Sequence, residues 1–317
     1  MSARLRPARV RVPCSTSNLG AGFDCIGLAL DRYLEVRFEP GPGAIRVERA
    51  GTLASLDVDA GDDGVVRALL AALAARSIPG SGGFLRMTSA IPVARGLGSS
   101  AAAAVAGLAL AAAAAGAGLD RAAALAAATE WESHPDNAAP ALLGGLVGIA
   151  RDAGGAPRAF RLPLSDRIGF AWAAPPVEVS TARARRALPE TVAHATAARA
   201  LGRVAALVRG LAEADAGLVR IGFTDELHVP HRLALIPGAE AAFEAARAAG
   251  AWAVTVSGSG SGLIAACASG EETRVAEAMG AALRAADAVE DALAGAGARV
   301  LAFPLHPDMT GAQILEP

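Results

Sequence analysis

The chain has 317 residues and a formal net charge of −2, and 53% of its residues are apolar although only 4% are aromatic. This length is enough for two domains with separate cores. Near-neutral charge without a basic stripe argues against a nucleic-acid partner. All 29 basic residues are arginines, which excludes a Schiff-base lysine and a lysine-containing P-loop.

Cysteine usage and hydropathy narrow the class of protein further. The cysteines at positions 14, 25 and 267 match no disulfide framework and no zinc spacing. The first residues lack the apolar segment of a signal peptide. The uncharged run 96–119 is long enough to cross a bilayer, but it consists mostly of alanine and glycine. Because alanine favours helix and is only weakly lipophilic, we predict a buried helix here, no membrane partner and a cytoplasmic protein.

Taken in chain order, the apolar periodicity predicts a mixture of strands and helices. Strands are predicted at 9–12, 34–38, 44–48, 84–88, 142–149, 168–173, 253–256, 263–267 and 299–303. Helices are predicted at 65–75, after Ser100, at 119–130, 193–214 and 239–249, and from 271. Residues 13–27 are predicted to be a loop, 228–232 a turn and 151–157 a domain boundary. The order predicts an α+β fold with domains 1–158 and 159–317.

The sharpest local motif is the segment 92–101, Pro-Val-Ala-Arg-Gly-Leu-Gly-Ser-Ser-Ala, which we call the phosphate loop. Gly96 and Gly98 allow the backbone N–H groups to converge, and the following helix adds free donors and a partial positive charge. The hydroxyls of Ser99 and Ser100 can reach a phosphate or a magnesium ion. The motif therefore predicts an anion site that needs no lysine; the alternative is a glycine-rich turn into a helix cap without a ligand.

Three segments in the same order resemble the GHMP kinases, a superfamily of ATP-dependent small-molecule kinases. Residues 13–30 are similar to the N-terminal motif, the phosphate loop is similar to that of the superfamily, and 256–262 resemble its C-terminal glycine loop. The resemblance implies a ribosomal-S5-domain-2-like N-terminal part and a ferredoxin-like C-terminal part, with ATP and substrate in the cleft between them. It places the ATP phosphates on Pro92, Arg95, Gly96, Leu97, Gly98, Ser99, Ser100 and Ala101.

The segment 132–145, with its Glu-Ser-His-Pro-Asp-Asn start, is similar to the homoserine kinases within that superfamily, and segments 180–189 and 225–232 agree. This resemblance implies transfer of the γ-phosphoryl group of MgATP to the side-chain hydroxyl of L-homoserine. The products would be ADP and O-phospho-L-homoserine, in threonine biosynthesis, and a homodimer is expected. Two alternatives stay open: another GHMP kinase acting on a sugar or an isoprenoid alcohol, and a non-catalytic ligand sensor.

A zwitterionic substrate needs a guanidinium for its carboxylate and a carboxylate for its ammonium. Register with the family motifs places the substrate on Asn18, Asp24, His134, Asn137, Thr181, Arg185, Arg232 and Gly258. Arg185 and Arg232 are expected at the carboxylate and Asp24 at the ammonium. The expected catalytic residues are Asn137, Asp24 and Ser100. Because the Asp–Lys pair of other members cannot form, and Asn137 can orient a hydroxyl but not deprotonate it, no general base is assigned.

Magnesium prefers hard oxygen ligands, and the resemblance points to Ser100 and Glu132, with Glu130 as the alternative carboxylate. The chain also departs from the family pattern at three places. The C-terminal glycine loop lacks the usual proline and threonine, and Ser133 replaces a glycine. Asp63 stands where the family has an asparagine lining the base pocket, so an acid there is expected to weaken or change the selection of the nucleotide base.

Overall fold

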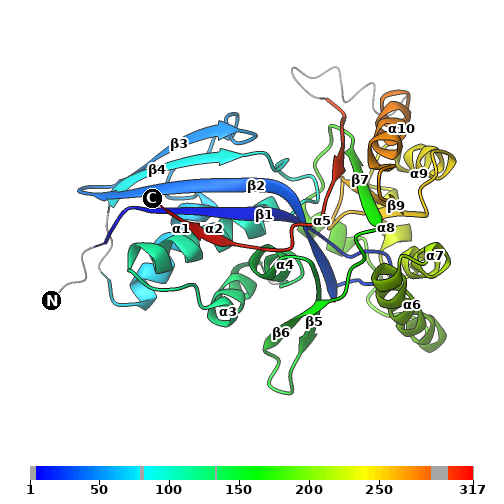
Figure 1. The fold of residues 1–317 in the computed structure, drawn as a ribbon, viewed down its shortest axis with the longest axis horizontal. Coiled ribbons are helices and arrows are strands. Elements are labelled where there is room, and N and C mark those ends of the chain that lie inside the picture. Colours follow the sequence, from blue (N-terminus) through cyan, green and yellow to red (C-terminus); the bar gives the residue numbers. More distant parts are fainter. Residues whose placement is uncertain (1–4, 79–81, 133, 287–298, 317) are drawn as a thin grey trace.

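A computed structural model of the chain describes residues 5–78, 82–132, 134–286 and 299–316, and within these ranges the strands form two sheets (Figure 1). The first sheet has seven strands, in the order β11-β1-β2-β4-β3, with β5 paired to β2 and β6 paired to β5. The second sheet has four strands in the order β10-β7-β9-β8. The α+β class expected from the mixed periodicity is confirmed.

The first sheet is antiparallel except for the parallel pair β3–β4. Its strands are β1 (Ala8–Ser17), β2 (Ile26–Gly41), β3 (Ile45–Gly51), β4 (Gly82–Ser89), β5 (Leu146–Arg151), β6 (Pro157–Leu162) and β11 (Gln313–Leu315). One side of this sheet carries α1 (Gly64–Ala75), α2 (Ser99–Ala114), α3 (Arg121–Glu132) and α4 (Ala138–Leu143) (Figure 1). On β2 the buried Leu34, Val36 and Phe38 alternate with more exposed residues, as expected when one face meets a core.

The alanine-rich helix α2 lies in the middle of the helical layer, and every residue from Ala104 to Ala114 is buried. Its small side chains allow α1 to come close: a Cβ added at Gly107 would lie 2.4 Å from the Cβ of Ala68. Close packing of this kind explains why the run has no polar face. Within the described ranges, no helix is both long and apolar enough to cross a membrane.

The second sheet is antiparallel throughout and is formed by β7 (Ile168–Ala174), β8 (Ala253–Val256), β9 (Leu263–Ala268) and β10 (Leu301–Leu305). Helices α9 (Ala239–Ala248) and α10 (Glu272–Arg284) pack against it. The remaining helices of this half are α5 (Thr181–Arg186), α6 (His194–Glu213), α7 (Ala216–Phe223) and α8 (Val229–Leu233). Strand β7 is buried on both faces, with Trp172 fully enclosed.

Three sequence-based predictions of local structure were wrong. The apolar run 142–149 is not one strand, because its first residues end α4, and Gly144 and Gly145 with positive φ separate that helix from β5. The predicted turn at 228–232 is the short helix α8; the Asp225 carboxylate caps it by accepting from the Val229 N–H at 2.7 Å. In the predicted loop 13–27, β1 continues to Ser17 and β2 already begins at Ile26.

The chain crosses between the two sheets more than once. Residues 151–157, predicted as a domain boundary, join β5 to β6 within the first sheet. Near the other end of the chain, β11 returns to the first sheet and pairs with β1. The division into domains 1–158 and 159–317 stays a prediction.

Candidate active site

The three glycine-rich segments, distant in sequence, meet at the N-terminus of α2. The Ser257 hydroxyl donates to the Gly96 carbonyl at 2.6 Å and lies 2.9 Å from the Thr16 hydroxyl. The Gly258 N–H donates to the Ser17 carbonyl at 3.0 Å. The end of β1, the phosphate loop and the loop after β8 therefore form one hydrogen-bonded unit that joins the two sheets.

Two glycines of the phosphate loop are required by this close approach. Gly96 has φ +75° and an added Cβ would lie 2.1 Å from the Ser257 carbonyl oxygen. Gly98 has φ +63° and an added Cβ would lie 2.3 Å from the Ser15 hydroxyl. Any side chain at either position would force the loop away from its neighbours.

The first turn of α2 keeps its backbone donors available. Gly98 occupies the N-cap position, and among the described residues no side chain caps the helix. Helix N–H groups without a cap, together with the helix dipole, form an anion site. Leu97 and Ala101 are buried, so these two predicted phosphate contacts can be made only by backbone. Arg95 is half-buried beside Glu178, and burial lowers the pKa of its guanidinium.

Next to this helix start lies a pocket of about 200 Å³ with a mostly apolar lining. The lining comes from β2, β4, α1, α2 and the loops that precede them: Leu34, Leu53, Leu56, Asp63, Gly64, Val65, Met87, Ser89, Ile91, Val93, Ser99, Ser100 and Ala103. Its position beside Ser99 and Ser100, and its apolar walls, suit the base of a nucleotide whose phosphates lie on α2.

The carboxylate of Asp63, at the edge of this pocket, has partners for both of its oxygens. Its Oδ1 caps α1 by accepting from the Val65 N–H at 2.9 Å, and its Oδ2 accepts from Arg49 Nη2 at 2.8 Å. Arg49 thus neutralises the charge that distinguishes Asp63 from an asparagine. Sequence reasoning missed Arg49, which is on β3.

The two predicted magnesium ligands are in contact. The Ser100 hydroxyl donates to Glu132 Oε1 at 2.5 Å. Both residues line a cleft of about 540 Å³, and the exposed Glu130 lines this cleft too. Across the described residues, no three His, Cys, Asp or Glu side chains come together to hold a metal. Two adjacent oxygens suit an ion such as Mg²⁺, which keeps waters and substrate phosphates as its other ligands.

Arg185 and Asp24, which the sequence analysis assigned to opposite ends of the substrate, bind each other. Arg185 Nη2 and Nη1 donate to the two carboxylate oxygens of Asp24 at 2.7 and 3.1 Å. The Asp24 N–H is held by the Asn18 side-chain oxygen at 2.9 Å, and Asp24 has φ +56°. Arg185 Nε is buried and has no partner among the described residues. Two of the residues predicted to bind the amino acid, Arg185 and Asp24, therefore lie together, but they are paired with each other.

Arg232 lies on the other side of the same cluster and is almost completely buried. Its Nη1 donates to the Gly258 carbonyl at 2.9 Å, an oxygen that also accepts from the Asn18 amide at 3.1 Å. The Phe23 ring lies near both guanidinium groups, 5.2 Å from that of Arg232 and 5.6 Å from that of Arg185. Burial, followed by the charge of Arg185, lowers the pKa of Arg232 to about 10.

The Asn137 side chain is held at both ends. Its Oδ1 accepts from the Ser15 hydroxyl at 3.1 Å, and its Nδ2 donates to the Ser17 hydroxyl oxygen at 2.9 Å. His134 is half-buried, and burial and Arg185 lower its pKa. Thr181 begins α5 and is exposed. Ser133, which replaces the glycine of the family pattern, lies outside the described residues.

Asp136 was given no role from the sequence, yet it is 4% exposed within this cluster. Burial and the charge of Asp24 raise the pKa of its carboxyl group, and a hydrogen bond from Ser17 acts in the opposite direction. A carboxylate directly before Asn137 in the segment 132–145 was the signal that could have found it. His228 is also buried; its Nε2 lies 2.9 Å from the Gly20 carbonyl, and burial lowers its pKa to about 4.

Comparison with known proteins agrees with this geometry. The models for the GHMP kinases N-terminal domain and the GHMP kinases C-terminal domain match residues 64–145 and 197–288. The homoserine kinase of Moorella thermoacetica is 42% identical over 265 residues, 81% of this chain and 86% of that protein. A homoserine kinase of Thermus thermophilus is 40% identical over 272 residues, 84% of this chain and 89% of that protein.

Solved structures show the same relationship. The crystal structure of homoserine kinase from Cytophaga hutchinsonii aligns with a TM-score of 0.80 and 29% identity over 98% of this chain and 97% of that chain. L. major mevalonate kinase in complex with R-mevalonate aligns with a TM-score of 0.70 at 16% identity over 97% and 99%, which indicates a shared fold alone. Both family models match, and a homoserine kinase that is more than 40% identical aligns over most of this chain. The chain therefore belongs to the homoserine kinases of the GHMP kinase superfamily.

Proposed function

We propose that this protein transfers the γ-phosphoryl group of MgATP to the side-chain hydroxyl of L-homoserine, giving ADP and O-phospho-L-homoserine. One observation carries the proposal most strongly: the loop around Gly258 connects the phosphate loop to the cluster of Asp24, Arg185 and Arg232. Ser257 binds the phosphate loop at Gly96, and the carbonyl of the next residue binds Arg232. A phosphate donor and a small amino acid would therefore lie against the same short piece of backbone.

The charge cluster suits an amino-acid zwitterion better than a sugar or an isoprenoid alcohol. Asp24 and Arg185 neutralise each other, with side chains 37% and 29% exposed. Because this pair is bidentate and Arg185 Nε is buried, separating it is costly unless a ligand replaces both partners. A bound amino acid would offer its ammonium to Asp24 and its carboxylate to Arg185 and Arg232, so each charge would regain a partner. A neutral acceptor would leave the pair unchanged and gain nothing from it.

The phosphate end uses backbone more than side-chain charge. The N–H groups of the first turn of α2 would hold the phosphate oxygens. Ser100 and Glu132 would hold Mg²⁺, which offsets the phosphate charge when bound. With the phosphates on α2, the apolar pocket beside Ser99 and Ser100 would receive the adenine base. The Asp63–Arg49 pair at the edge of this pocket would present no net charge to the base.

Asn137 is suited to position the acceptor oxygen. Ser15 and Ser17 hold its amide in one orientation, and each amide N–H₂ group has a second hydrogen available for the substrate hydroxyl. The acceptor oxygen forms the new bond to the γ-phosphorus, the bond to the β–γ bridging oxygen breaks, and ADP leaves. An amide cannot take the hydroxyl proton, which would pass to the transferred phosphoryl group or to water. In a loose transition state, positioning and charge neutralisation supply most of the catalysis.

The test is ADP release by the purified chain with MgATP and each of L-homoserine, L-serine, L-threonine, galactose and mevalonate. We expect turnover with L-homoserine far above that with the other four acceptors. Two variants on the same helix test the site. Arg185→Gln should abolish the preference for L-homoserine, whereas Arg183→Gln should retain it, because Arg183 is exposed. Turnover with galactose or mevalonate instead would refute the amino-acid substrate, and ATP binding without turnover of any acceptor would favour a ligand sensor.

A further inference from the structure

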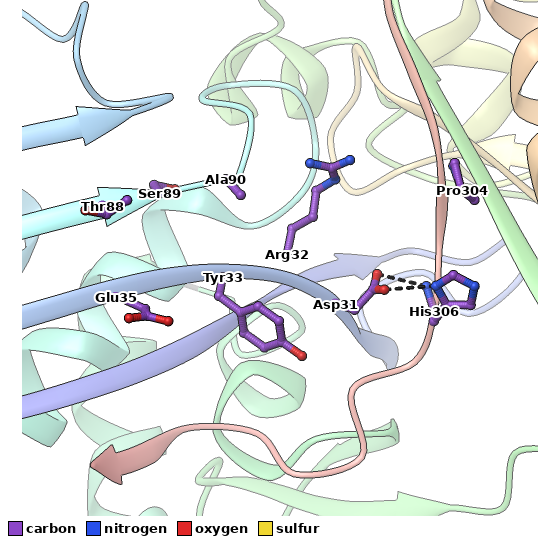
Figure 2. Close-up of a pocket in the computed structure, with 9 residues that line it drawn as sticks. All are labelled: Asp31, Arg32, Tyr33, Glu35, Thr88, Ser89, Ala90, Pro304 and His306. Atoms are coloured by element: carbon purple, nitrogen blue, oxygen red, sulfur yellow. Dashed lines mark hydrogen bonds and ion pairs between the residues drawn. The ribbon is translucent and has the colours of Figure 1, made fainter. Parts of the chain in front are cut away.

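A groove of about 510 Å³ lies on the face of the first sheet opposite to α1 and α2. On β2, Tyr33 and Glu35 line the groove, whereas Leu34 between them lines the apolar pocket on the helical side. Asp31 and Arg32 also line the groove, because they lie where the register between β1 and β2 shifts and strict alternation is interrupted. Pro304 and His306, at and just after the end of β10, close the groove from the second sheet (Figure 2). Of the residues that line this groove, Ser89 also lines the proposed base pocket, and none belongs to the residues proposed for the phosphates, Mg²⁺ or the amino acid.

The acidic groups of the groove already have protein partners. Asp31 accepts from the His306 backbone N–H through Oδ1 at 2.9 Å, and its Oδ2 lies 2.9 Å from His306 Nδ1 (Figure 2). Glu35 forms an ion pair with Arg9 at 2.9 Å. The Tyr33 hydroxyl donates to Asp308 at 2.9 Å. These groups therefore do not require a cationic ligand.

Arg32 is different, because its charge has no such partner. Within the described residues no carboxylate lies within 4.0 Å of its guanidinium, and its Nε is buried without a hydrogen-bond partner. The guanidinium lies over the Phe303 ring, 3.5 Å from the centroid, and Figure 2 shows it reaching into the space between Ala90 and Pro304. Burial lowers the pKa of this guanidinium, and the charge of Asp31 offsets this only in part, as expected for a cation that has lost part of its water without a directly bound anion.

We propose that this groove is a second binding site, for a small monocarboxylate whose carboxylate is held by Arg32. A planar guanidinium fixed by stacking matches a carboxylate in a bidentate geometry. The neighbouring Asp31 and Glu35 disfavour a second negative charge on the ligand, so a phosphate dianion fits less well. The groove volume of about 510 Å³ exceeds what a carboxylate alone would fill, which leaves room for a carbon skeleton along Thr88 and Ser89.

The test uses saturation-transfer NMR on the full chain, with butanoate as the probe, butylamine as a comparison ligand and inorganic phosphate as a competitor of butanoate. Butanoate could also bind at the proposed amino-acid site, so the measurement includes Arg185→Gln. We expect butanoate transfer that survives Arg185→Gln and falls at least about fivefold in Arg32→Gln, as the loss of a charge-assisted contact predicts. Arg37→Gln is the matched control, because Arg37 is on the same strand but pairs with Glu39 in solvent at 3.2 Å.

Arg32→Lys is a second variant for the case that Arg32→Gln folds poorly. Lysine retains the charge and loses the planar guanidinium, so butanoate transfer should lie between that of the wild type and that expected for Arg32→Gln. Three results would overturn the proposal. One is no butanoate transfer in the wild-type protein at millimolar probe. Another is a signal that disappears in Arg185→Gln and persists in Arg32→Gln. The third is displacement of butanoate by inorganic phosphate at a concentration equal to or below that of butanoate.

Discussion

The contact between the phosphate loop and the C-terminal glycine loop predicts a severe effect of Gly96→Ala. An alanine at φ +75° costs about 1–2 kcal/mol from backbone strain alone. Its Cβ would also lie 2.1 Å from the Ser257 carbonyl oxygen, where ordinary contact begins at 3.4 Å. Because that atom belongs to backbone, the two loops must move apart by more than 1 Å, and the Ser257–Gly96 hydrogen bond is lost at a further cost of about 1 kcal/mol.

A displacement of about 1 Å at a phosphate site can lower the rate roughly 100-fold. We therefore expect Gly96→Ala to lower the free energy of unfolding by about 3 kcal/mol and kcat/KM for L-homoserine by about 100-fold. The assays are urea unfolding and ADP release at saturating MgATP and several L-homoserine concentrations.

Gly43→Ala is the matched control, because Gly43 has φ +83° and nothing lies within 4 Å of its added Cβ. It should show only the strain cost of about 1–2 kcal/mol and nearly unchanged kcat/KM. If Gly96→Ala behaves like Gly43→Ala in both assays, the loop contact has no role in the site.

Three further predictions follow from the site. Glu132→Gln should raise the Mg²⁺ concentration needed for half-maximal activity at least about tenfold, because a hard oxygen ligand is lost. Glu130→Gln should raise it less than about twofold, and a magnesium titration of each variant tests the difference. Asp24→Asn should raise the KM for L-homoserine more than about tenfold, with the KM for ATP changed less than about twofold; equal effects on both would contradict an ammonium contact. Burial lowers the pKa of His228 from its ordinary 6.5 to about 4 in the folded protein. Between these two pH values the unfolded chain binds the extra proton, so stability falls as pH falls, by up to about 1.4 kcal/mol per unit. Urea unfolding at pH 7 and pH 5 should show this part of the slope missing in His228→Gln; an unchanged slope would contradict it.

Local signals were sufficient for much of the fold and for the phosphate loop. A strand, a glycine-rich turn and a long uncharged helix are adjacent in sequence, so the start of α2 at Ser99 was recognisable from residues 92–101. Continuous apolar runs were less informative, since a short buried strand and a buried helix end have the same composition. This ambiguity caused the error at 142–149, and β11 has only three residues, too few for a periodic pattern.

The partners of charged residues were beyond sequence reasoning. Arg185 and Asp24 are 161 positions apart, and Arg49 and Asp63 are on different elements. Motif register identified three of these residues but not which charges neutralise each other. Asp136 illustrates the same limit, because its significance comes from burial beside Asp24, which depends on the folded chain.

Phosphoryl transfer to the homoserine hydroxyl can be followed by ³¹P NMR of a reaction of the purified chain with MgATP and L-homoserine. We expect a new phosphomonoester resonance, coupled to the γ-methylene protons of homoserine, that grows in equal amount with ADP. We also expect that the resonance does not form with Arg185→Gln. Growth of inorganic phosphate without a phosphomonoester, or no consumption of ATP, would contradict the proposed transfer.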